Sequence, residues 1–140
     1  MRGINKVTLI GSVVADPDIQ VTARGKRVAH MIVSTVKEWK GADGEMKKQD
    51  MRHQVEIWDH LDRPGLASMV EQHVVCGTYV LVEGAIEYSD YTSKSRGTPM
   101  QSTKVLAKHI LILAEPSSTG KTVEVRDLEM EMSGPYATAE

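Results

Sequence analysis

The hydrophobic pattern of the first 114 residues is that of β-strands. Apolar and polar residues alternate over several segments, and this alternation places successive side chains on opposite faces of a strand. Val and Ile together outnumber Leu and Met, a bias that is typical of sheets. We therefore predict five strands, at Lys6–Val14, Arg27–Trp39, Lys47–Trp58, Thr78–Tyr88 and Gln101–Leu113.

The segments between these strands carry turn signals. Asp43-Gly44 lies between the second and third predicted strands and indicates a hairpin. The stretch Ser89–Thr98 is rich in Ser, Thr and Lys and lies between the fourth and fifth, where it predicts a longer, flexible hairpin arm.

One short helix is expected between the third and fourth strands. Asp62 is the candidate N-cap, Pro64 fits the first turn, and Gly77 follows as a stop. The inner face is expected to consist of the residues at i, i+3, i+4 and i+7, namely Leu66, Met69, Val70 and His73.

This order of elements favours one fold class. Three strands, a helix and two further strands fit an all-β, five-stranded OB barrel with one short helix between strands 3 and 4. An immunoglobulin-like sandwich would need about seven shorter strands and no helix. A chain of 140 residues suits a single such domain.

The net charge of −2 averages two unlike parts. Residues 1–114 hold 15 Lys and Arg against 13 Asp and Glu, a balance of +2, whereas residues 115–140 hold 2 against 6, a balance of −4. A Pro/Ser/Gly cluster begins the second part, and 26 residues are too few to bury a core. We therefore predict a domain at 1–114 and an acidic, flexible tail at 115–140.

The aromatic residues are few, with two Trp, four Tyr and no Phe. Alternation places Trp58 beside Arg52 in a polar row, and Trp39 beside Lys37 in another, while Tyr91 lies at the root of the Ser/Thr/Lys-rich arm. For a single Trp, half-burial is the simpler interpretation. Two Trp in polar rows among many cations favour a surface that stacks unpaired bases and neutralises phosphates.

The remaining chemistry indicates neither an enzyme nor a metal site. His73 and Cys76 lack a second pair at zinc-ligand spacing, so we expect structural roles for them, and we expect a core position for His53. The sequence holds no nucleophile elbow or phosphate loop, and we predict no cofactor. One cysteine suits a reducing compartment, and the longest apolar run is too short for a membrane span, so we expect a cytoplasmic protein that acts near the nucleoid.

Several short motifs, in order and spacing, resemble one known family, the bacterial single-stranded DNA-binding proteins, over about residues 2–113. They are Arg2–Gly11, Asp16-Pro17, Glu38-Trp39, Gly44–Lys47, His53 with Trp58 five residues on, and Val82-Glu83-Gly84.

The resemblance implies a non-enzymatic protein that binds single-stranded DNA with little sequence preference, as a homotetramer, in replication, recombination or repair. The four base-stacking positions of the family fall on Trp39, Arg52, Trp58 and Tyr91, and Arg52 departs from the usual aromatic residue. Arg can still stack its guanidinium plane on a base. We expect phosphate contacts from the nearby cations, Arg2, Lys6, Arg24, Lys26, Arg27, Lys37, Lys40, Lys47, Lys48, Lys94 and Arg96.

Two departures leave alternatives open. The stretch 62–66 is longer than usual before the helix, and the tail lacks the family's long linker and acidic tip ending in Ile-Pro-Phe. The acidic–apolar segment 127–132 is either a hook for a protein partner or a solvated tail. The alternative functions are an OB accessory protein that acts mainly as a protein-interaction module in replication restart or recombination, and an RNA-binding OB domain.

Overall fold

The computed structural model describes residues 1–116, so most of the predicted tail, including segment 127–132, lies outside the described residues. The elements follow in the order β1 (Val7–Val13), β2 (Asp18–Val21), β3 (Lys26–Lys40), β4 (Met46–His60), α1 (Leu66–His73), β5 (Tyr79–Thr92) and β6 (Pro99–Ala114).

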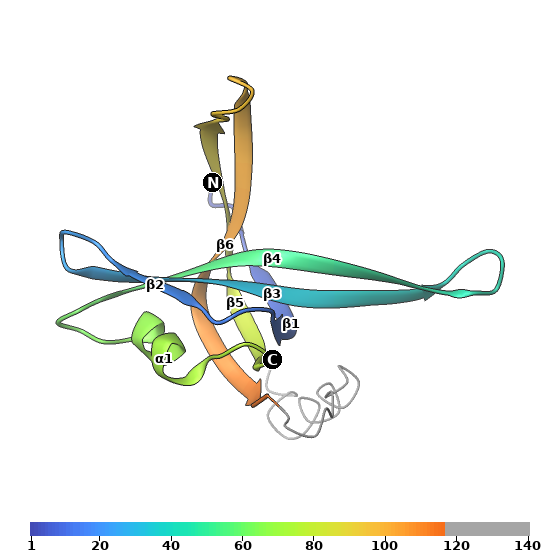
Figure 1. Ribbon diagram of the computed structural model, residues 1–140, viewed down its shortest axis with the longest axis horizontal. Coiled ribbons are helices and arrows are strands. Elements are labelled where there is room, and N and C mark those ends of the chain that lie inside the picture. Colours follow the sequence, from blue (N-terminus) through green and yellow to red (C-terminus); the bar gives the residue numbers. More distant parts are fainter. Residues whose placement is uncertain (117–140) are drawn as a thin grey trace.

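Five of these strands close into a barrel. The sheet runs β1-β5-β6-β4-β3-β2, and a further pairing of β1 with β3 joins its two sides. The β4–β6 pairing is parallel, with Val55 opposite Val105, and the other pairings are antiparallel. The predicted OB barrel, with one short helix after its third strand, is confirmed. Figure 1 shows the β3–β4 and β5–β6 hairpins extending beyond the barrel in different directions.

Strand β2 is the second half of the first barrel strand. Val13 lies opposite Val33, and Asp18 lies opposite His30. Four residues therefore separate Val13 from Asp18 on the first strand, whereas only two residues separate their partners on β3. The interruption includes Pro17, which has no backbone N–H to donate to a ladder. The predicted uninterrupted strand thus ends at Val13, and β2, at four residues, is too short for its pattern to be recognised.

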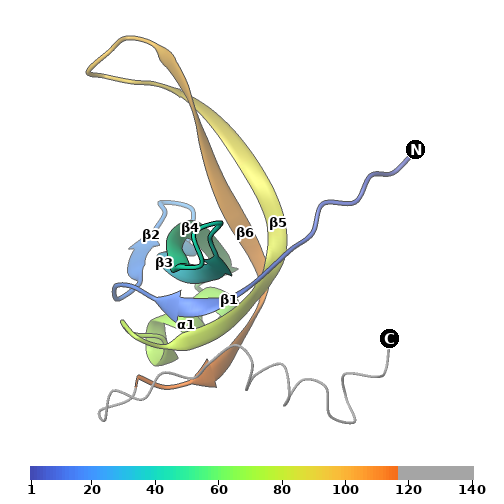
Figure 2. The same cartoon turned by 90° about the vertical axis from the view of Figure 1, so that its right-hand side faces the viewer.

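The core is small and aliphatic. Its fully buried side chains include Val33, Val55, Ile57 and Val80, and among residues 1–116 no buried core residue is aromatic. Small residues also allow strands to cross closely: a Cβ on Gly84 would lie 2.0 Å from a backbone oxygen of β6. Figure 2 views the molecule along the β3–β4 arm and shows β5 and β6 curving past the barrel into their own arm. The core of the barrel consists of Val, Ile, Ala and Met side chains.

The helix begins later than predicted. Its N-cap is Gly65, which provides no side-chain cap, so the predicted cap at Asp62 is wrong. The carboxylate of Asp59, at the end of β4, performs this role by accepting hydrogen bonds from the N–H groups of Gly65 (2.9 Å) and Ser68 (2.7 Å). Of the predicted inner face, Val70 is buried and Leu66 and Met69 pack against the core, whereas His73 is exposed. The helix also buries Ala67 and Ser68.

The two long hairpins form the arms of the molecule. At the tip of the β3–β4 arm, Gly44 has φ 83° and donates a hydrogen bond to the carbonyl of Gly41 (3.0 Å), which confirms the Asp-Gly hairpin. The β5–β6 arm remains paired as far as Thr92 and Pro99. The stretch Ser89–Thr98, predicted as a longer, flexible hairpin arm, thus consists of four strand residues, 89–92, followed by a turn at 93–98.

Candidate nucleic-acid interface

One row of β4 side chains faces away from the barrel core. Arg52, Gln54 and Trp58 alternate with buried Val55 and Ile57, so they point to the opposite side of the strand. Trp58 is 41% exposed although it lies within the barrel sheet. This row defines what we call the outer face.

The outer face continues across β6 onto the β5–β6 arm. Lys104 of β6 forms an ion pair with Glu56 of β4 (2.8 Å), and it lies opposite Glu87 of β5. Tyr91, four residues after Glu87, has the same parity and points to the same side. The structure thus brings Arg52, Trp58 and Tyr91 onto one continuous face.

Trp39 does not share this orientation. It lies opposite Lys47, and its row on β3 continues into Met31 and Val33, whose side chains are in the core. Beyond the barrel this row emerges on the β3–β4 arm, where Trp39 is 39% exposed and the Lys37 ammonium lies 5.7 Å from its ring centroid. The register therefore does not place Trp39 on the same barrel face as Arg52 and Trp58.

The described aromatic residues are concentrated on the surface. Trp39, Trp58, Tyr88 and Tyr91 are between 39% and 60% exposed, and only Tyr79 is largely covered. Burial raises the pKa of Tyr79 above its ordinary value. Because large aromatics are usually among the most buried side chains, this distribution favours a stacking surface over a packing role.

A buried carboxylate lies in the middle of the outer face. Burial alone would raise the pKa of Glu56, but hydrogen bonds from Lys104 and Trp58 and the positive charge of Lys104 outweigh it and lower that pKa. The same hydrogen bond raises the pKa of Lys104. Both groups are therefore charged at neutral pH. Lys104 was not among the predicted contacts, because nothing in its local sequence shows that it faces the outer face beside Glu56.

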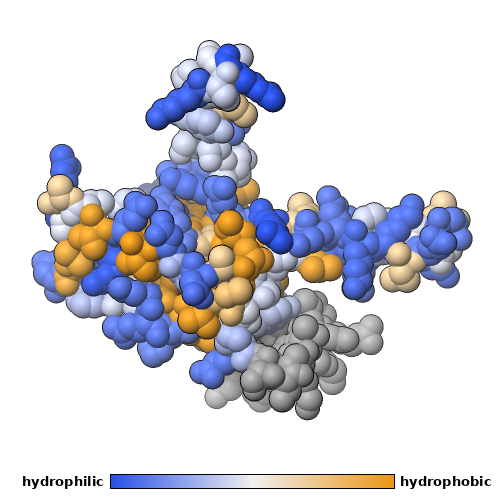
Figure 3. Space-filling model, viewed as in Figure 1, coloured by the Kyte–Doolittle hydropathy of each residue, from blue (hydrophilic) through white to orange (hydrophobic). Residues whose placement is uncertain are grey.

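Most predicted phosphate contacts are exposed at the ends of hairpins. The β3–β4 arm carries Lys37, Lys40, Lys47 and Lys48, the β5–β6 tip carries Lys94 and Arg96, the β2–β3 turn carries Arg24 and Lys26, and the N-terminal segment carries Arg2 and Lys6. In the space-filling view both arms are mainly hydrophilic (Figure 3).

Some of these cations already have acidic partners. Lys6 bonds Glu83 at 2.7 Å, and Lys48 lies 3.4 Å from Glu38, but both lysines are more than 60% exposed and their ion pairs are weak in water. Arg27 is different.

The side chain of Arg27 is only 15% exposed and is held by Asp59 (3.1 Å) and Glu71 (3.3 Å). This geometry explains Arg27 as a structural residue that joins β3, β4 and α1, and it argues against the predicted phosphate contact.

Other chemistry is limited in the part of the chain that the structure describes. Within residues 1–116 no three His, Cys, Asp or Glu side chains are grouped so that they could hold a metal ion. His53 is partly buried and shares a hydrogen bond with the hydroxyl of Thr35 (2.8 Å). Over the same residues, no helix has the length and apolar character needed to cross a membrane.

Closed OB barrels form a class of proteins that bind extended ligands such as oligonucleotides and oligosaccharides on their surface. The exposed aromatic side chains and cationic hairpins of this barrel suit such a ligand. Residues 4–113 match the sequence model described as the single-strand binding protein family. The chain belongs to this family.

Relatives and solved structures agree with this assignment. The chain is 33% identical over 122 residues to the mitochondrial single-stranded DNA-binding protein 1-A of Xenopus laevis, covering 81% of this chain and 80% of that one. It is 30% identical over 125 residues to the single-stranded DNA-binding protein of Rickettsia prowazekii, covering 86% and 79%.

Among solved structures, its fold is similar to a Plasmodium falciparum SSB complex with ssDNA, with a TM-score of 0.72, 22% identity and coverage of 81% of this chain and 98% of that one. It is also similar to a deletion mutant of the single-stranded DNA binding protein from Thermus aquaticus, with a TM-score of 0.68, 25% identity and coverage of 81% and 52%.

Proposed function

We propose that the protein binds single-stranded DNA with little sequence preference and protects it in replication, recombination or repair, without catalysing a reaction. The observation that carries this proposal is the outer face, where Arg52, Trp58 and Tyr91 are exposed on one side of a barrel belonging to the single-strand binding family. Every unpaired base has a π-face, so stacking on such side chains tolerates any sequence.

The strand crosses the outer face and then follows the β3–β4 arm. Bases stack on Trp58 and on the guanidinium of Arg52, whose side chain is 63% exposed, and Tyr91 borders the path from the second arm. Two-stranded ribbons twist strongly. A strand that follows the twist of the β3–β4 arm therefore reaches Trp39 on the other side.

Phosphates are neutralised by the cations of the arms and turns. Their flexible side chains suit backbone contacts that carry no sequence information. Because the described body has only a small positive balance, binding will weaken at lower salt concentrations than it does for a strongly basic protein.

The family resemblance supports two further parts of the proposal, and the acidic–apolar composition of the tail supports a third. The protein assembles as a homotetramer, so that several outer faces form one wrapping path. It acts in the cytoplasm near the nucleoid. The acidic–apolar segment 127–132 offers a contact for a protein partner.

The two tyrosines of the β5–β6 arm provide a matched test. Tyr91 points to the outer face, whereas Tyr88 has the opposite parity and is equally available, at 60% exposed. We expect Tyr91→Ala to weaken binding of oligo-deoxythymidine by about 5- to 150-fold, the equivalent of one lost stack. We expect Tyr88→Ala to leave it nearly unchanged.

Tryptophan fluorescence is recorded during the same titration. Stacking should quench Trp39 and Trp58 in the wild-type protein, and removal of one Trp should remove part of the quench. If emission does not change at low salt and a gel shift detects no complex, the proposed function is wrong. Competition with an RNA oligomer of the same sequence tests the choice of nucleic acid.

A further inference from the structure

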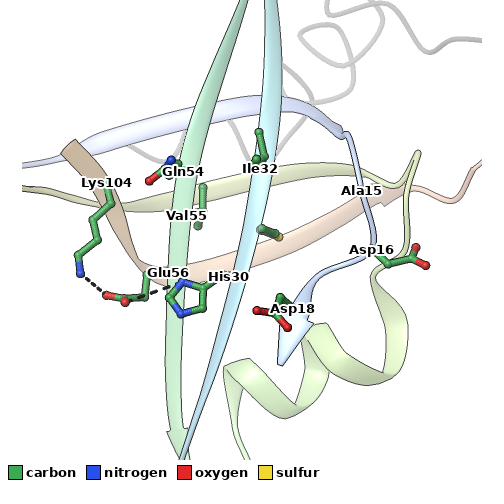
Figure 4. A pocket seen from close by; sticks show the side chains of 10 residues that line it. Ala15, Asp16, Asp18, His30, Ile32, Gln54, Val55, Glu56 and Lys104 are labelled. Carbon is green, nitrogen blue, oxygen red and sulfur yellow. Dashed lines mark ion pairs between the residues drawn. The ribbon is translucent and has the colours of Figure 1, made fainter. Parts of the chain in front are cut away.

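A cleft of about 370 Å³ opens on the outer face, a size typical of sites for small ligands. It lies between the β1–β2 connection and the surface of β3 and β4 (Figure 4). This is where the first barrel strand has more residues than β3, so the extra residues leave part of β3 uncovered. Its polar walls consist of Asp16, Asp18, His30, Gln54, Glu56 and Lys104.

The cleft lies between two of the stacking positions. Gln54 and Glu56, which line it, fall between Arg52 and Trp58 in the same row of β4. At about 3.3 Å per residue, Arg52 and Trp58 are roughly 20 Å apart along the strand. A DNA strand that stacks bases on both side chains therefore carries intervening nucleotides over the cleft.

The charges of the cleft suit a base better than a phosphate. Glu56 and Lys104 neutralise each other on one wall, and the carboxylate of Asp18 remains on the other, while the carboxylate of Asp16 points away from these residues (Figure 4). Asp16 is held in place by the N–H of Cys76 (2.8 Å), and Asp18 accepts a hydrogen bond from Gln20 (3.2 Å). A carboxylate can only accept hydrogen bonds, so this wall repels phosphate and attracts an amino group.

We propose that this cleft is a base subsite, which receives one base of the bound strand and favours a base with an exocyclic amino group. This inference rests on the proposed function. The amino group of cytosine donates to the Asp18 carboxylate, a pairing that carboxylates make with cytosine in other nucleic-acid complexes. Uracil and thymine present a carbonyl at the same ring position and are repelled.

Deoxycytidine and deoxyuridine homo-oligomers of equal length test the proposal, because their bases differ at the position that faces the carboxylate. We expect the wild-type protein to bind the deoxycytidine oligomer about three- to tenfold more tightly, which is within the net range of one ordinary hydrogen bond. Asp18→Asn should reduce this ratio towards one, because an amide can donate to a carbonyl as well as accept.

Asp62→Asn is the matched control. Asp62 is also exposed and the substitution changes the charge equally, but Asp62 does not line the cleft. It should raise the affinity for both oligomers slightly and leave their ratio intact. Circular dichroism of each variant checks the fold before binding is measured.

The outcomes separate the two proposals. Equal wild-type affinities for the two oligomers, or a preference that survives Asp18→Asn, would overturn the base subsite and leave single-strand binding untouched. Failure to bind either oligomer, with an intact fold, would instead overturn the proposed function.

Discussion

Replacing Asp59 with Ala should destabilise the protein more than any surface substitution. Asp59 follows Trp58 on β4, and its side chain is only 5% exposed. It accepts hydrogen bonds from the backbone N–H groups of Gly65 and Ser68 and from the guanidinium of Arg27 (3.1 and 3.3 Å). One carboxylate thus joins the start of α1 to two strands that carry the outer face.

The expected cost follows from these partners. Breaking a buried ion pair by removing one member costs about 3–5 kcal/mol. A hydrogen bond to a charged group is worth about 1.5–3 kcal/mol, but such contributions overlap when they share one carboxylate. Arg27 keeps Glu71, and Gly65 is exposed and can reach water. We therefore expect Asp59→Ala to lower the free energy of unfolding by about 3–4 kcal/mol, and Asp59→Asn by about half as much.

Urea unfolding, followed by circular dichroism, measures this change. An oligomer's stability depends on protomer concentration, so every variant must be compared at the same concentration. Asp62→Ala is the control, and we expect it to stay within about 0.5 kcal/mol of the wild-type value. A loss below about 1 kcal/mol for Asp59→Ala would show that α1 and Arg27 do not depend on this carboxylate.

The same group predicts a dependence on pH. Burial alone would raise the pKa of Asp59, but the N–H groups of Gly65 and Ser68 and the charge of Arg27 outweigh it and lower that pKa from its ordinary value of 3.8. A carboxyl with a lowered folded pKa stabilises the fold at pH values above its unfolded pKa. That contribution is lost as the pH falls from about 3.8 through the folded pKa, and Asp59→Asn should lack this part of the acid sensitivity.

Three further substitutions and one control test other parts of the structure. Gly84→Ala would place a Cβ 2.0 Å from the carbonyl oxygen of Leu106, so we expect a loss of about 2 kcal/mol or more in thermal unfolding, and an unchanged Tm would contradict the close strand crossing. Lys47→Gln should reduce the log–log salt slope of binding by about 0.7. Lys108→Gln, on β6 and outside the predicted contacts, should not reduce it. Arg52→Trp should bind more tightly at high salt, because stacking persists where charge is screened; weaker binding there would argue against a base at this position.

The sequence was sufficient to place the five barrel strands, most clearly in β3, β4 and β5, where buried residues alternate with exposed or partly exposed ones. The rows containing Val55 and Ile57, or Val80 and Val82, are read directly from the chain. The Asp-Gly turn was also visible, because Gly44 needs a positive φ that few other residues adopt.

The residue that caps the N-terminus of α1 could not be predicted from the local sequence. Local rules place the cap within the residues just before the helix, and Asp62 is the obvious candidate there. The observed acceptor is Asp59, which belongs to a strand and reaches the helix only because the chain folds back. Its partner Arg27 was interpreted as a phosphate contact because a charged residue near a turn is usually exposed, although alternation places Arg27 in the same β3 row as the buried Ala29 and Met31.

The orientation of Trp39 shows how far alternation can be taken. Alternation assigns each residue to a face of its own strand, but only the register across a turn relates the faces of two strands. The Asp43-Gly44 turn sets Lys40 opposite Met46, and this register puts Trp39 and Trp58 on opposite sides of the β3–β4 ribbon. The core agrees with it, because Trp39 shares its row with buried Met31 whereas Trp58 alternates with buried Ile57. The proposed stacking positions Trp39, Arg52 and Trp58 therefore lie on both sides of a twisted ribbon, and a DNA strand that contacts all three would have to turn with it.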